Sequence, residues 1–558
     1  MALSRTRSAA VYGIEAHFID VEVDMYPSDQ RDFITVGMPD TAVRESRERI
    51  KSALINSGYG YPAKSVTINL APANVKKEGA GFDLPMALGI LGAMGVLALP
   101  EDHLFVGELS LDGSLRPVRG TLSVAVAAQK AGIKTLVVPT DNGAEAAIAG
   151  GVRVFALPHL TEVVNFLREQ GARVPGGAAP SQSNGDWFDQ ATATKPSTNR
   201  AAEASTGTAT VQAVTPSKYQ PVERAPFVQV MPTGESGVLD FAEVRGQTTA
   251  KRALEVAAAG GHNVLMIGPP GSGKTMLAKR FPGILPPLTF TEAVEATQIH
   301  SIAGALPKRM GLLTTRPYRA PHHTVSEAGL VGGGVGVPRP GEVSLAHHGV
   351  LFLDELPEFQ RNVLELLRQP LEDRQVTIAR SAMTLSFPAS FVLVAAMNPC
   401  PCGFFGDTTR ECRCTGAIIA RYLAKLSGPL LDRIDLHIEV PAVPYQELRA
   451  RNTNSPASPV STAQMRARVC EARDLQQKRG FYNSLIPSRE LHKLCELDAA
   501  GERTLEMAVR RMGLSARAHD RILKVARTVA DLDKAERVSA KHLAEAVQYR
   551  SLDRNYWQ

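Results

Sequence analysis

The stretch that most constrains the fold is GPPGSGKT at residues 268–275, which follows the apolar run VLMI at residues 264–267. Its spacing, G-x-x-x-x-G-K-[ST] between a strand and a helix, is typical of a phosphate-binding loop, because the glycines let consecutive backbone N–H groups turn toward phosphate oxygens. Lys274 is expected to reach the β- and γ-phosphates, and the Thr275 hydroxyl to hold Mg²⁺. A glycine-rich turn without a nucleotide would need neither side chain. The predicted ATP-binding residues are Gly268, Pro269, Pro270, Gly271, Ser272, Gly273, Lys274 and Thr275.

The length and composition of the chain indicate a multidomain globular protein. Its 558 residues exceed what one hydrophobic core organises, since a domain usually takes about 100–200 residues. No apolar run reaches the ~18 residues that cross a bilayer, and the basic N-terminus lacks the apolar region of a secretory signal. We therefore expect a cytoplasmic protein without a membrane partner. The net charge of +6 is only a weak indication of polyanionic partners.

Changes in composition along the chain predict an α/β multidomain fold. Residues 1–170 alternate β-type and helical runs, as in an α/β or α+β domain. Residues 171–236 are rich in Ala, Gly, Pro, Ser, Thr and Gln and bury too little apolar surface to offset the entropy of ordering, so a flexible linker is expected. A P-loop α/β core is predicted at residues 237–445, and a helical C-terminal domain, or lid, at residues 446–558.

Two further apolar runs end in polar residues that suit ATP hydrolysis. Residues 349–353 lead into Asp354 and Glu355, and residues 391–397 lead into Asn398. Downstream of a phosphate-binding loop, the first carboxylate is expected to support Mg²⁺ and the second to polarise the attacking water. Neither role asks for covalent chemistry, because phosphoryl transfer depends mostly on positioning and charge stabilisation. The alternative is that the carboxylates only mark the solvent-facing end of a buried strand.

The sequence resembles the YifB/ComM family of magnesium-chelatase-like AAA+ ATPases over essentially its whole length, apart from the predicted linker. The resemblance rests on motif residues in a fixed order and on three signature stretches. The stretches are RPYRAPHHTVSEAGLVGGG (316–334), PRPGEVSLAHHGVLFLDELPEF (338–359) and LRQPLEDRQVTIAR (367–380). The motif residues are Lys274, Asp354, Glu355, Asn398, Arg433 and Arg517. The resemblance implies an AAA+ core that uses ATP and Mg²⁺ and forms a homo-oligomeric ring, expected to be a hexamer.

Three of the motif residues take roles that the resemblance implies. Asn398 occupies the sensor-1 position. Arg433 would act as an arginine finger on the γ-phosphate of the neighbouring subunit, and Arg517 would bind a phosphate as the sensor-2 residue. The residues alone leave other interpretations open. Arg433 could form an intrachain ion pair with the flanking Asp432 and Asp435. Arg517 could be a surface residue, although an arginine in the first turns of a helix is electrostatically unfavourable.

The resemblance also implies a motor that acts on single-stranded or branched DNA. In this family the implied activity is branch migration during homologous recombination and natural transformation, with a recombinase as a candidate partner. Residues 371–380 are predicted to form a hairpin, with Asp373 and Arg374 as turn residues between a helix end and a β-type run, and the matching hairpin of related AAA+ proteins points into the pore of the ring. Arg374 and Arg380 are therefore candidate contacts to a DNA backbone, which would be sensitive to salt. The alternative is a solvated hairpin tip.

Four cysteines fall in one short segment that begins just after Asn398. They are Cys400, Cys402, Cys412 and Cys414. Four thiolates suit tetrahedral Zn²⁺, but C-x-C spacing is less common than C-x-x-C, and reduced thiols in a loop are the alternative. The adjacent histidine pairs at residues 322–323 and 347–348 are not interpreted as metal ligands, because such pairs more often form hydrogen bonds.

The N-terminal residues resemble the domain shared by Lon-type proteases and magnesium-chelatase-like ATPases. The resemblance rests on VTINLAPANVKKEGAGFDLPMALGIL (66–91) and on GELSLDGSLRPVRG (107–120). Lon-like peptidases use a Ser–Lys dyad in which a lysine activates the serine. The loop at residues 77–83 contains no serine, and residues 120–124 contain no lysine. We therefore expect a Lon-like domain that is not an active protease and that has a structural or substrate-engaging role.

Two other classes of function remain as alternatives to a DNA motor. The first is a protein-remodelling motor, either a chelatase-type subunit working with a partner or a protease-coupled unfoldase. The sequence contains no integrin-like metal-binding module, and its Lon-like domain lacks the dyad, so both observations favour DNA. The second is a scaffold that only binds ATP, and Glu355 argues against it because a pure binding site needs no water-polarising carboxylate.

Overall fold

The computed structural model describes residues 3–30, 32–172, 218–228, 239–334, 336–380, 383–407, 410–443, 460–512 and 515–552. The chain divides into two compact units. The first comprises Met1–Ala10 and Ala16–Arg224, and the second comprises Val11–Glu15 and Ala225–Gln558. Most of the predicted linker, at residues 173–217 and 229–238, lies outside the described residues, so its flexibility stays a prediction.

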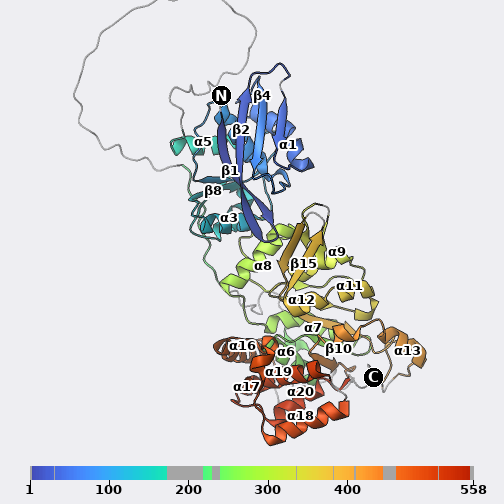
Figure 1. Ribbon diagram of the computed structural model, residues 1–558. Coiled ribbons are helices and arrows are strands. Elements are labelled where there is room, and N and C mark those ends of the chain that lie inside the picture. Colours follow the sequence, from blue (N-terminus) through green and yellow to red (C-terminus); the bar gives the residue numbers. More distant parts are fainter. Residues whose placement is uncertain are drawn as a thin grey trace, which may run out of the picture. The chain divides into compact units, whose positions relative to one another are not determined.

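The first unit is built on two small sheets covered by helices (Figure 1). One sheet has the order β1-β2-β4-β3, and the other has the order β5-β8-β9 with parallel pairing. The strands are β1 (Ser4–Tyr12), β2 (Glu15–Tyr26), β3 (Phe33–Val36), β4 (Ser65–Ala71), β5 (His103–Phe105), β8 (Thr135–Pro139) and β9 (Arg153–Leu157), with a short β6 (Glu108–Leu109) and β7 (Leu115–Arg116) hairpin. The helices are α1 (Thr41–Asn56), α2 (Asp83–Ala93), α3 (Thr121–Lys130), α4 (Gly143–Ala147) and α5 (Leu160–Glu169).

One part of the predicted linker packs on the first unit. The Tyr219 hydroxyl donates to Glu162 (2.7 Å), and its ring meets Phe166 edge to face with the centroids 5.6 Å apart. The backbone N–H of Val222 donates to the carbonyl oxygen of Val154 in β9 (2.7 Å). The prediction of a flexible linker is therefore wrong for residues 218–224, because a buried aromatic ring and a backbone hydrogen bond hold this segment.

A parallel five-stranded sheet forms the centre of the second unit, with the order β11-β14-β17-β10-β18. The strands are β10 (Val264–Ile267), β11 (Tyr318–Arg319), β14 (Val350–Leu353), β17 (Val392–Met397) and β18 (Leu436–Glu439). Successive residues point to opposite faces, and both faces are buried. In β10, Val264 and Met266 join one hydrophobic core, while Leu265 and Ile267 join another. This double burial explains why the sequence shows continuous apolar runs here.

Helices cover the two faces of this sheet in different ways. Helix α6 and the C-terminal helices share the first core, whereas the second core contains shorter segments from residues 330–371 and 422–434. Figure 1 shows α6, α16, α19 and α20 gathered together. Thus the C-terminal helices, predicted as a separate lid, share a core with the ATPase sheet.

The C-terminal helices are α16 (Thr462–Arg479), α17 (Ser488–Leu494), α18 (Ala499–Met512), α19 (Ala516–Leu532) and α20 (Ala540–Gln548). The earlier helices are α6 (Thr248–Gly260), α7 (Lys274–Arg280), α8 (Phe290–Ala303), α9 (Glu327–Val331), α10 (Glu342–Leu345), α11 (Arg361–Glu365), α12 (Arg368–Asp373), α13 (Gly416–Leu423) and α14 (Gly428–Leu431).

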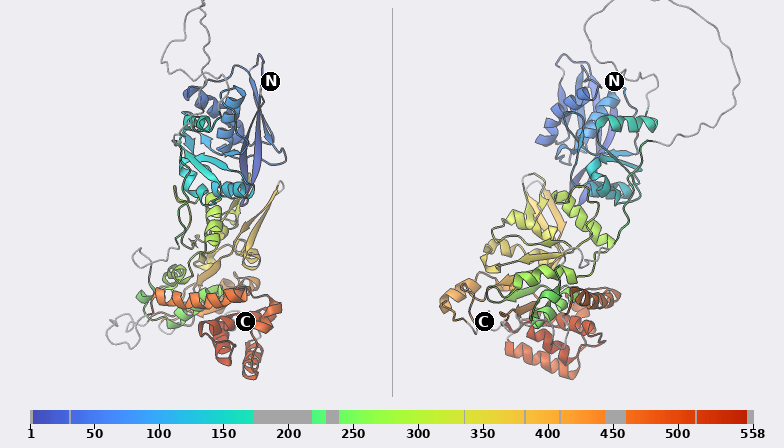
Figure 2. Two further views of the ribbon diagram at one scale, coloured as in Figure 1. Left: turned by 90° about the vertical axis from the view of Figure 1, so that its left-hand side faces the viewer. Right: turned by 180° about the vertical axis from the view of Figure 1, so that it is seen from behind.

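The predicted hairpin exists, and Arg374 lies at its base. Strands β15 (Gln375–Arg380) and β16 (Met383–Pro388) pair in antiparallel register and form a two-stranded arm (Figure 2). Residues 381–382, between the two strands, lie outside the described residues. Arg374 follows α12 directly with a positive φ of 57°, so the turn predicted between a helix end and a β-type run is confirmed. This turn is not the tip of the arm, and Arg380 is the arginine at the far end of β15.

Candidate nucleotide site and arginine cluster

The phosphate-binding loop leaves the carboxyl end of β10 and encloses the amine of Lys274. The Nζ atom of Lys274 donates to the carbonyl oxygens of Gly268 (2.7 Å) and Pro269 (2.9 Å) and to Oδ1 of Asn398 (3.2 Å). Lys274 is 8% exposed, and burial lowers its pKa, while the nearby Asp354 and Glu355 raise it. A phosphate would supply the negative charge that this buried ammonium group lacks.

Close packing fixes the first glycine of the loop. The backbone N–H of Gly268 donates to the carbonyl oxygen of Met397 (3.2 Å), which joins the loop to the end of β17. A Cβ atom at residue 268 would lie 2.1 Å from the carbonyl oxygen of Val440. Only glycine fits this contact, which explains the residue type at this position. Gly273, just before α7, has a φ of 96°, a conformation that also favours glycine.

The predicted magnesium ligands lie side by side at the carboxyl ends of β10 and β14. The Thr275 hydroxyl donates to Oδ2 of Asp354 (2.7 Å), and the other carboxylate oxygen of Asp354 accepts from the backbone N–H of Glu355 (3.0 Å). Hard oxygen ligands of this kind suit Mg²⁺, which prefers one or two carboxylates together with phosphate oxygens and water. The two side chains therefore fit a Mg²⁺ ion, which would neutralise charge on the β- and γ-phosphates.

Glu355 is held in an unusual backbone conformation that directs its side chain to solvent. Its φ is 53°, and its side chain is 58% exposed. The Nδ1 atom of His323 lies 3.8 Å from Oε2 of Glu355, and the His323 ring also meets Phe359 edge to face. Non-glycine residues with positive φ are uncommon and cluster at functional sites. The carboxylate therefore has the exposure that an attacking water requires, with a histidine beside it.

A cavity of about 620 Å³ next to the loop has room for a nucleoside. Gln247, at the start of α6, bridges this cavity and the loop, because its Nε2 donates to the carbonyl oxygens of Pro441 (2.6 Å) and Ser272 (3.2 Å). The cavity lining combines the start of α6, the end of β18 and the C-terminal residues after α20. It includes Gly246, Gln247, Thr248, Ile438, Tyr549 and Leu552.

Arg433 lies at the other end of the sheet from the phosphate-binding loop. Its backbone carbonyl accepts from the side chain of Asn263 (3.0 Å), and Asn263 directly precedes β10. The four residues of β10 alone span about 13 Å. The guanidinium group of Arg433 donates to the carbonyl oxygen of Pro429 (2.7 Å) and pairs with Glu372. The intrachain ion pair thus exists, but with Glu372 rather than with the flanking aspartates.

Arg517 lies with Arg433 and not with Lys274. Both arginines line a cavity of about 250 Å³, together with Glu372, Arg521 and Lys524. Arg517 is exposed in the first turn of α19, and Arg433, Arg517 and Arg521 all contribute to lowering the pKa of Glu372. We call Arg433, Arg517, Arg521 and Lys524 the arginine cluster. The cluster lies near the amino end of β10, whereas a phosphate bound at Lys274 would lie at its carboxyl end.

The second histidine pair forms hydrogen bonds, as the sequence suggested. The backbone N–H of Ser390 donates to Nδ1 of His347 (3.0 Å), so the neutral ring carries its proton on Nε2, which donates to Glu295 (3.2 Å). The Nε2 atom of His348 also lies 2.7 Å from Glu295. Glu295, His347 and His348 lie close enough to hold a metal, but both ring nitrogens of His347 already have partners.

Sequence reasoning missed one contact of this site, between His323 and Glu355. His323 lies in a loop far from Glu355 along the chain, so its contact depends on tertiary structure. The predicted ATPase residues are brought together as two groups, one around Lys274 and one around Arg433.

The sheet order, the loop after β10, the carboxylates after β14 and the amide after β17 together define a P-loop ATPase core. Comparison with protein families agrees with this class. The model for "Magnesium chelatase, subunit ChlI" matches residues 240–448. The model for "Subunit ChlI of Mg-chelatase" matches residues 21–142, and that for "Magnesium chelatase, subunit ChlI C-terminal" matches residues 459–550.

Individual relatives align over nearly the whole chain. Protein YifB of Salmonella typhimurium is 40% identical over 559 residues, which cover 99% of this chain and 98% of the relative. Competence protein ComM of Haemophilus influenzae is 40% identical with the same coverage of both chains. A Lon protease of Metamycoplasma arthritidis is 25% identical over 131 residues, covering 22% of this chain and 16% of its own.

The chain therefore belongs to the YifB/ComM family of magnesium-chelatase-like AAA+ ATPases. Proteins of this class use ATP and Mg²⁺, in agreement with the chemistry of the side chains around Lys274. The partial similarity to a Lon protease supports the resemblance found in the sequence. Among the described residues, no helix combines the length and apolar content that crossing a bilayer requires.

Proposed function

We propose that this protein is an ATP-driven ring motor on DNA, in which the arginine cluster of one subunit completes the ATP site of the next. The observation that carries the proposal is the position of Lys274 and Arg433 at opposite ends of β10. One chain holds the phosphate-binding residues at one end of β10 and, about 13 Å or more away near the other end, a cluster of cations that suits a phosphate. A head-to-tail ring brings these two surfaces together at every interface, and a hexamer is the ring that the family resemblance implies.

Each side chain has a defined role in the proposed hydrolysis. Lys274 binds the β- and γ-phosphates, and Glu355 polarises the attacking water from its exposed position. Asn398, already hydrogen-bonded to Lys274, lies where it can orient the γ-phosphate. Bound Mg²⁺, held by Thr275 and Asp354, would supply charge neutralisation on the phosphates.

For Arg433 to act on the neighbouring subunit, it must exchange its ion pair with Glu372 for one with the γ-phosphate. Arg433, whose side chain is 11% exposed, now pairs with Glu372, whose side chain is 56% exposed, so a phosphate would have to replace this carboxylate as its partner. A γ-phosphate from the adjoining subunit offers Arg433 more negative charge than one carboxylate does. Arg517 lines the same cavity, which supports a role for it in stabilising the same phosphate group. Hydrolysis would therefore depend on assembly, which couples ATP turnover to movement between subunits.

The proposal that the motor acts on DNA rests on the β15–β16 arm and on the family. Arg380 is exposed at the far end of β15, where a backbone phosphate could reach it. Arg374 is a weaker candidate, because it is half-buried and donates to the carbonyl oxygen of Phe391 (2.8 Å). A relative of similar length is named competence protein, and on this basis we propose branch migration during homologous recombination and uptake of transforming DNA.

The test compares nucleic acids with polypeptides as activators and then measures the movement of DNA. ATP hydrolysis should rise more with forked or four-way DNA than with an unfolded polypeptide, and the rise should fall steeply with salt. Synthetic three- and four-stranded junctions should be converted to products with ATP but not with a non-hydrolysable analogue, and Lys274→Ala should abolish both activities. Stronger activation by polypeptide, with junctions left intact, would replace this proposal with a protein-remodelling motor.

A further inference from the structure

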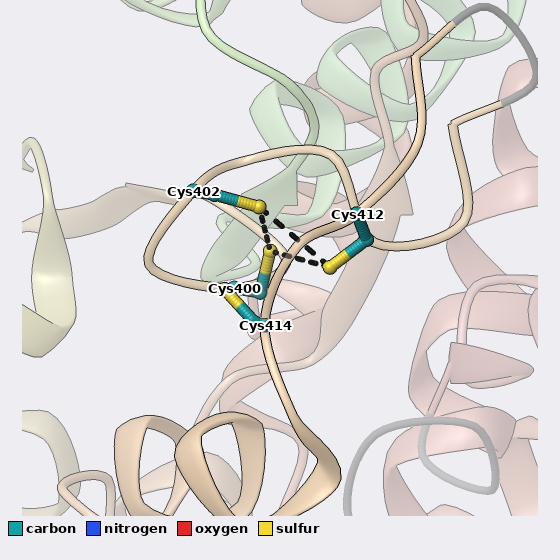
Figure 3. A group of neighbouring side chains, drawn as sticks. All are labelled: Cys400, Cys402, Cys412 and Cys414. Atoms are coloured by element: carbon teal, nitrogen blue, oxygen red, sulfur yellow. Dashed lines mark hydrogen bonds between the residues drawn. The ribbon is translucent and has the colours of Figure 1, made fainter.

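A loop between β17 and α13 brings four cysteine side chains to one point (Figure 3). The Sγ atom of Cys400 lies 3.3 Å from that of Cys402 and 3.7 Å from that of Cys412, and the sulfurs of Cys402 and Cys412 are 3.6 Å apart. Cys414 completes the group, since all four sulfurs lie within 4.8 Å of one another. Figure 3 shows that two of the cysteines come from the beginning of the loop and two from its end.

The distances fit a tetrahedral metal centre better than a disulfide. A disulfide requires an S–S distance of about 2.05 Å, and all four cysteines are free. Four thiolates bound to Zn²⁺ at about 2.3 Å lie about 3.8 Å from one another at the corners of a tetrahedron. The three distances given above are within about 0.5 Å of this value. A small outward shift of the sulfurs would therefore accommodate the ion.

The loop that carries the cysteines also contacts the ATP site, both near Asn398 and at the phosphate-binding loop. Cys400 is buried and follows Asn398 by two residues, so the first ligand fixes the backbone next to the side chain that contacts Lys274. Gly403 lies directly against Pro270 of the phosphate-binding loop, where an added Cβ would come within 2.4 Å of the proline Cδ. At the other end, Tyr422 of α13 forms a hydrogen bond with the backbone of Asn398.

We propose that Cys400, Cys402, Cys412 and Cys414 bind one Zn²⁺ ion tetrahedrally, and that the ion holds Asn398 in position beside the phosphate-binding loop. Each thiol releases its proton to solvent on binding, and the ion stays divalent without any redox step. With all four positions filled by sulfur, the site is structural and has no open position for catalysis. The coupling to hydrolysis rests on the proposed ATPase mechanism, whereas metal binding does not.

Metal binding is tested on the full-length protein, purified under reducing conditions without added metal. Elemental analysis should find about one zinc per chain, and X-ray absorption should show four sulfur ligands at about 2.3 Å. The double variant Cys412→Ser/Cys414→Ser should lose the zinc, while Cys470→Ser, a cysteine outside the loop, should keep it. The proposal would be overturned if the wild-type protein contained no stoichiometric zinc or contained iron instead. It would also be overturned if the double variant retained its zinc.

The coupling is tested with the same variants. In Cys412→Ser/Cys414→Ser, kcat for ATP should fall by up to about 100-fold while binding of a fluorescent ATP analogue is nearly unchanged, because Asn398 is displaced by a small distance. Gly403→Ala should also lower kcat but keep its zinc, since the added methyl group presses on Pro270 and not on the ligands. Zinc loss without a change in kcat would contradict the coupling and leave the metal site standing. If wild-type protein binds zinc but hydrolyses no ATP, the proposed function fails instead.

Discussion

Lys274 and Arg433 lie at opposite ends of the same strand, β10, of the parallel sheet. The four residues of this strand span about 13 Å, so the two cations cannot act on one phosphate within a single chain. Arg517 lines the same cavity as Arg433. This arrangement makes assembly part of the proposed chemistry, and the predictions below follow from it.

Arg433→Ala is expected to reduce kcat for ATP by about 10³-fold or more, because an arginine finger stabilises charge on the transferring phosphoryl group. The affinity for a non-hydrolysable ATP analogue should change little, since the phosphate-binding loop of the same chain is intact. Steady-state ATPase assays and analogue titration measure the two effects. Arg510→Ala is the matched control, because Arg510 is 79% exposed and pairs with Glu506 on the same helix. Equal losses in both variants would refute the role of Arg433.

Glu355→Gln should trap ATP on the protein. The amide keeps the shape of the side chain but polarises water poorly, so hydrolysis should fall by about 10²- to 10⁴-fold while ATP binding persists. His323→Asn should have a smaller effect, because the imidazole only neighbours the carboxylate at 3.8 Å. Rapid-quench assays with equilibrium ATP binding distinguish these outcomes. Normal hydrolysis by the glutamine variant would move the water-activating role to another residue.

Arg380→Gln should weaken DNA binding without changing ATP binding. If Arg380 contacts one phosphate per subunit, each lost contact should reduce the slope of log Kd against log salt by about one unit. The control is Arg368→Gln, because Arg368 is 43% exposed but pairs with Glu365 of α11 and lies at the start of α12, at the opposite end of this helix from the arm. Fluorescence anisotropy over a range of salt concentrations measures the slopes. An unchanged slope in the Arg380 variant would exclude the end of β15 as a phosphate contact.

Acidification should destabilise the ATPase unit through its buried histidines. Burial lowers the pKa of His347 below the ordinary value of 6.5, although Glu295 and Glu292 oppose this effect. Burial likewise lowers the pKa of His300. Below pH 6.5 the unfolded chain therefore binds more protons than the folded chain, so stability is present above this pH and is lost as the pH falls.

The melting temperature should consequently drop between about pH 7.5 and pH 5.5, and the drop should be smaller in His347→Asn. Differential scanning fluorimetry without nucleotide measures both curves. Asn can still accept the hydrogen bond from Ser390 but does not titrate. Identical pH dependence in the two proteins would show that His347 does not contribute.

Local patterns predicted the elements of the ATPase core well. Continuous apolar runs identified β10, β14 and β17 because strands buried on both faces need no alternation. The C-terminal residues form helices α16 to α20, in keeping with the predicted helical character, and a capping box of Ser461 and Gln464 defines the start of α16 at Thr462. Lys274, Asp354 and Asn398 lie together because each directly follows a parallel strand or its loop.

Predictions that depended on tertiary packing were less accurate. Asp373 and Arg374 form the predicted turn between a helix end and a strand, but the arm extends beyond them through β15, so Arg374 lies at its base and not at its tip. Residues 218–224 have the composition of a linker, but one buried tyrosine attaches them to the first unit. The pairing of Arg433 with Glu372 joins residues far apart in sequence, and nothing local distinguishes it from pairing with an adjacent aspartate.

The most direct test of the shared active site mixes two variants that should each be inactive. Lys274→Ala and Arg433→Ala chains are co-expressed with different tags, and assemblies that contain both are isolated by sequential affinity steps. An interface that joins the intact loop of one chain to the intact arginine of the other should hydrolyse ATP. Random mixing should make about a quarter of the interfaces competent, so about a quarter of the wild-type rate is expected. Mixed assemblies that stay as inactive as either variant alone would contradict a site shared between subunits.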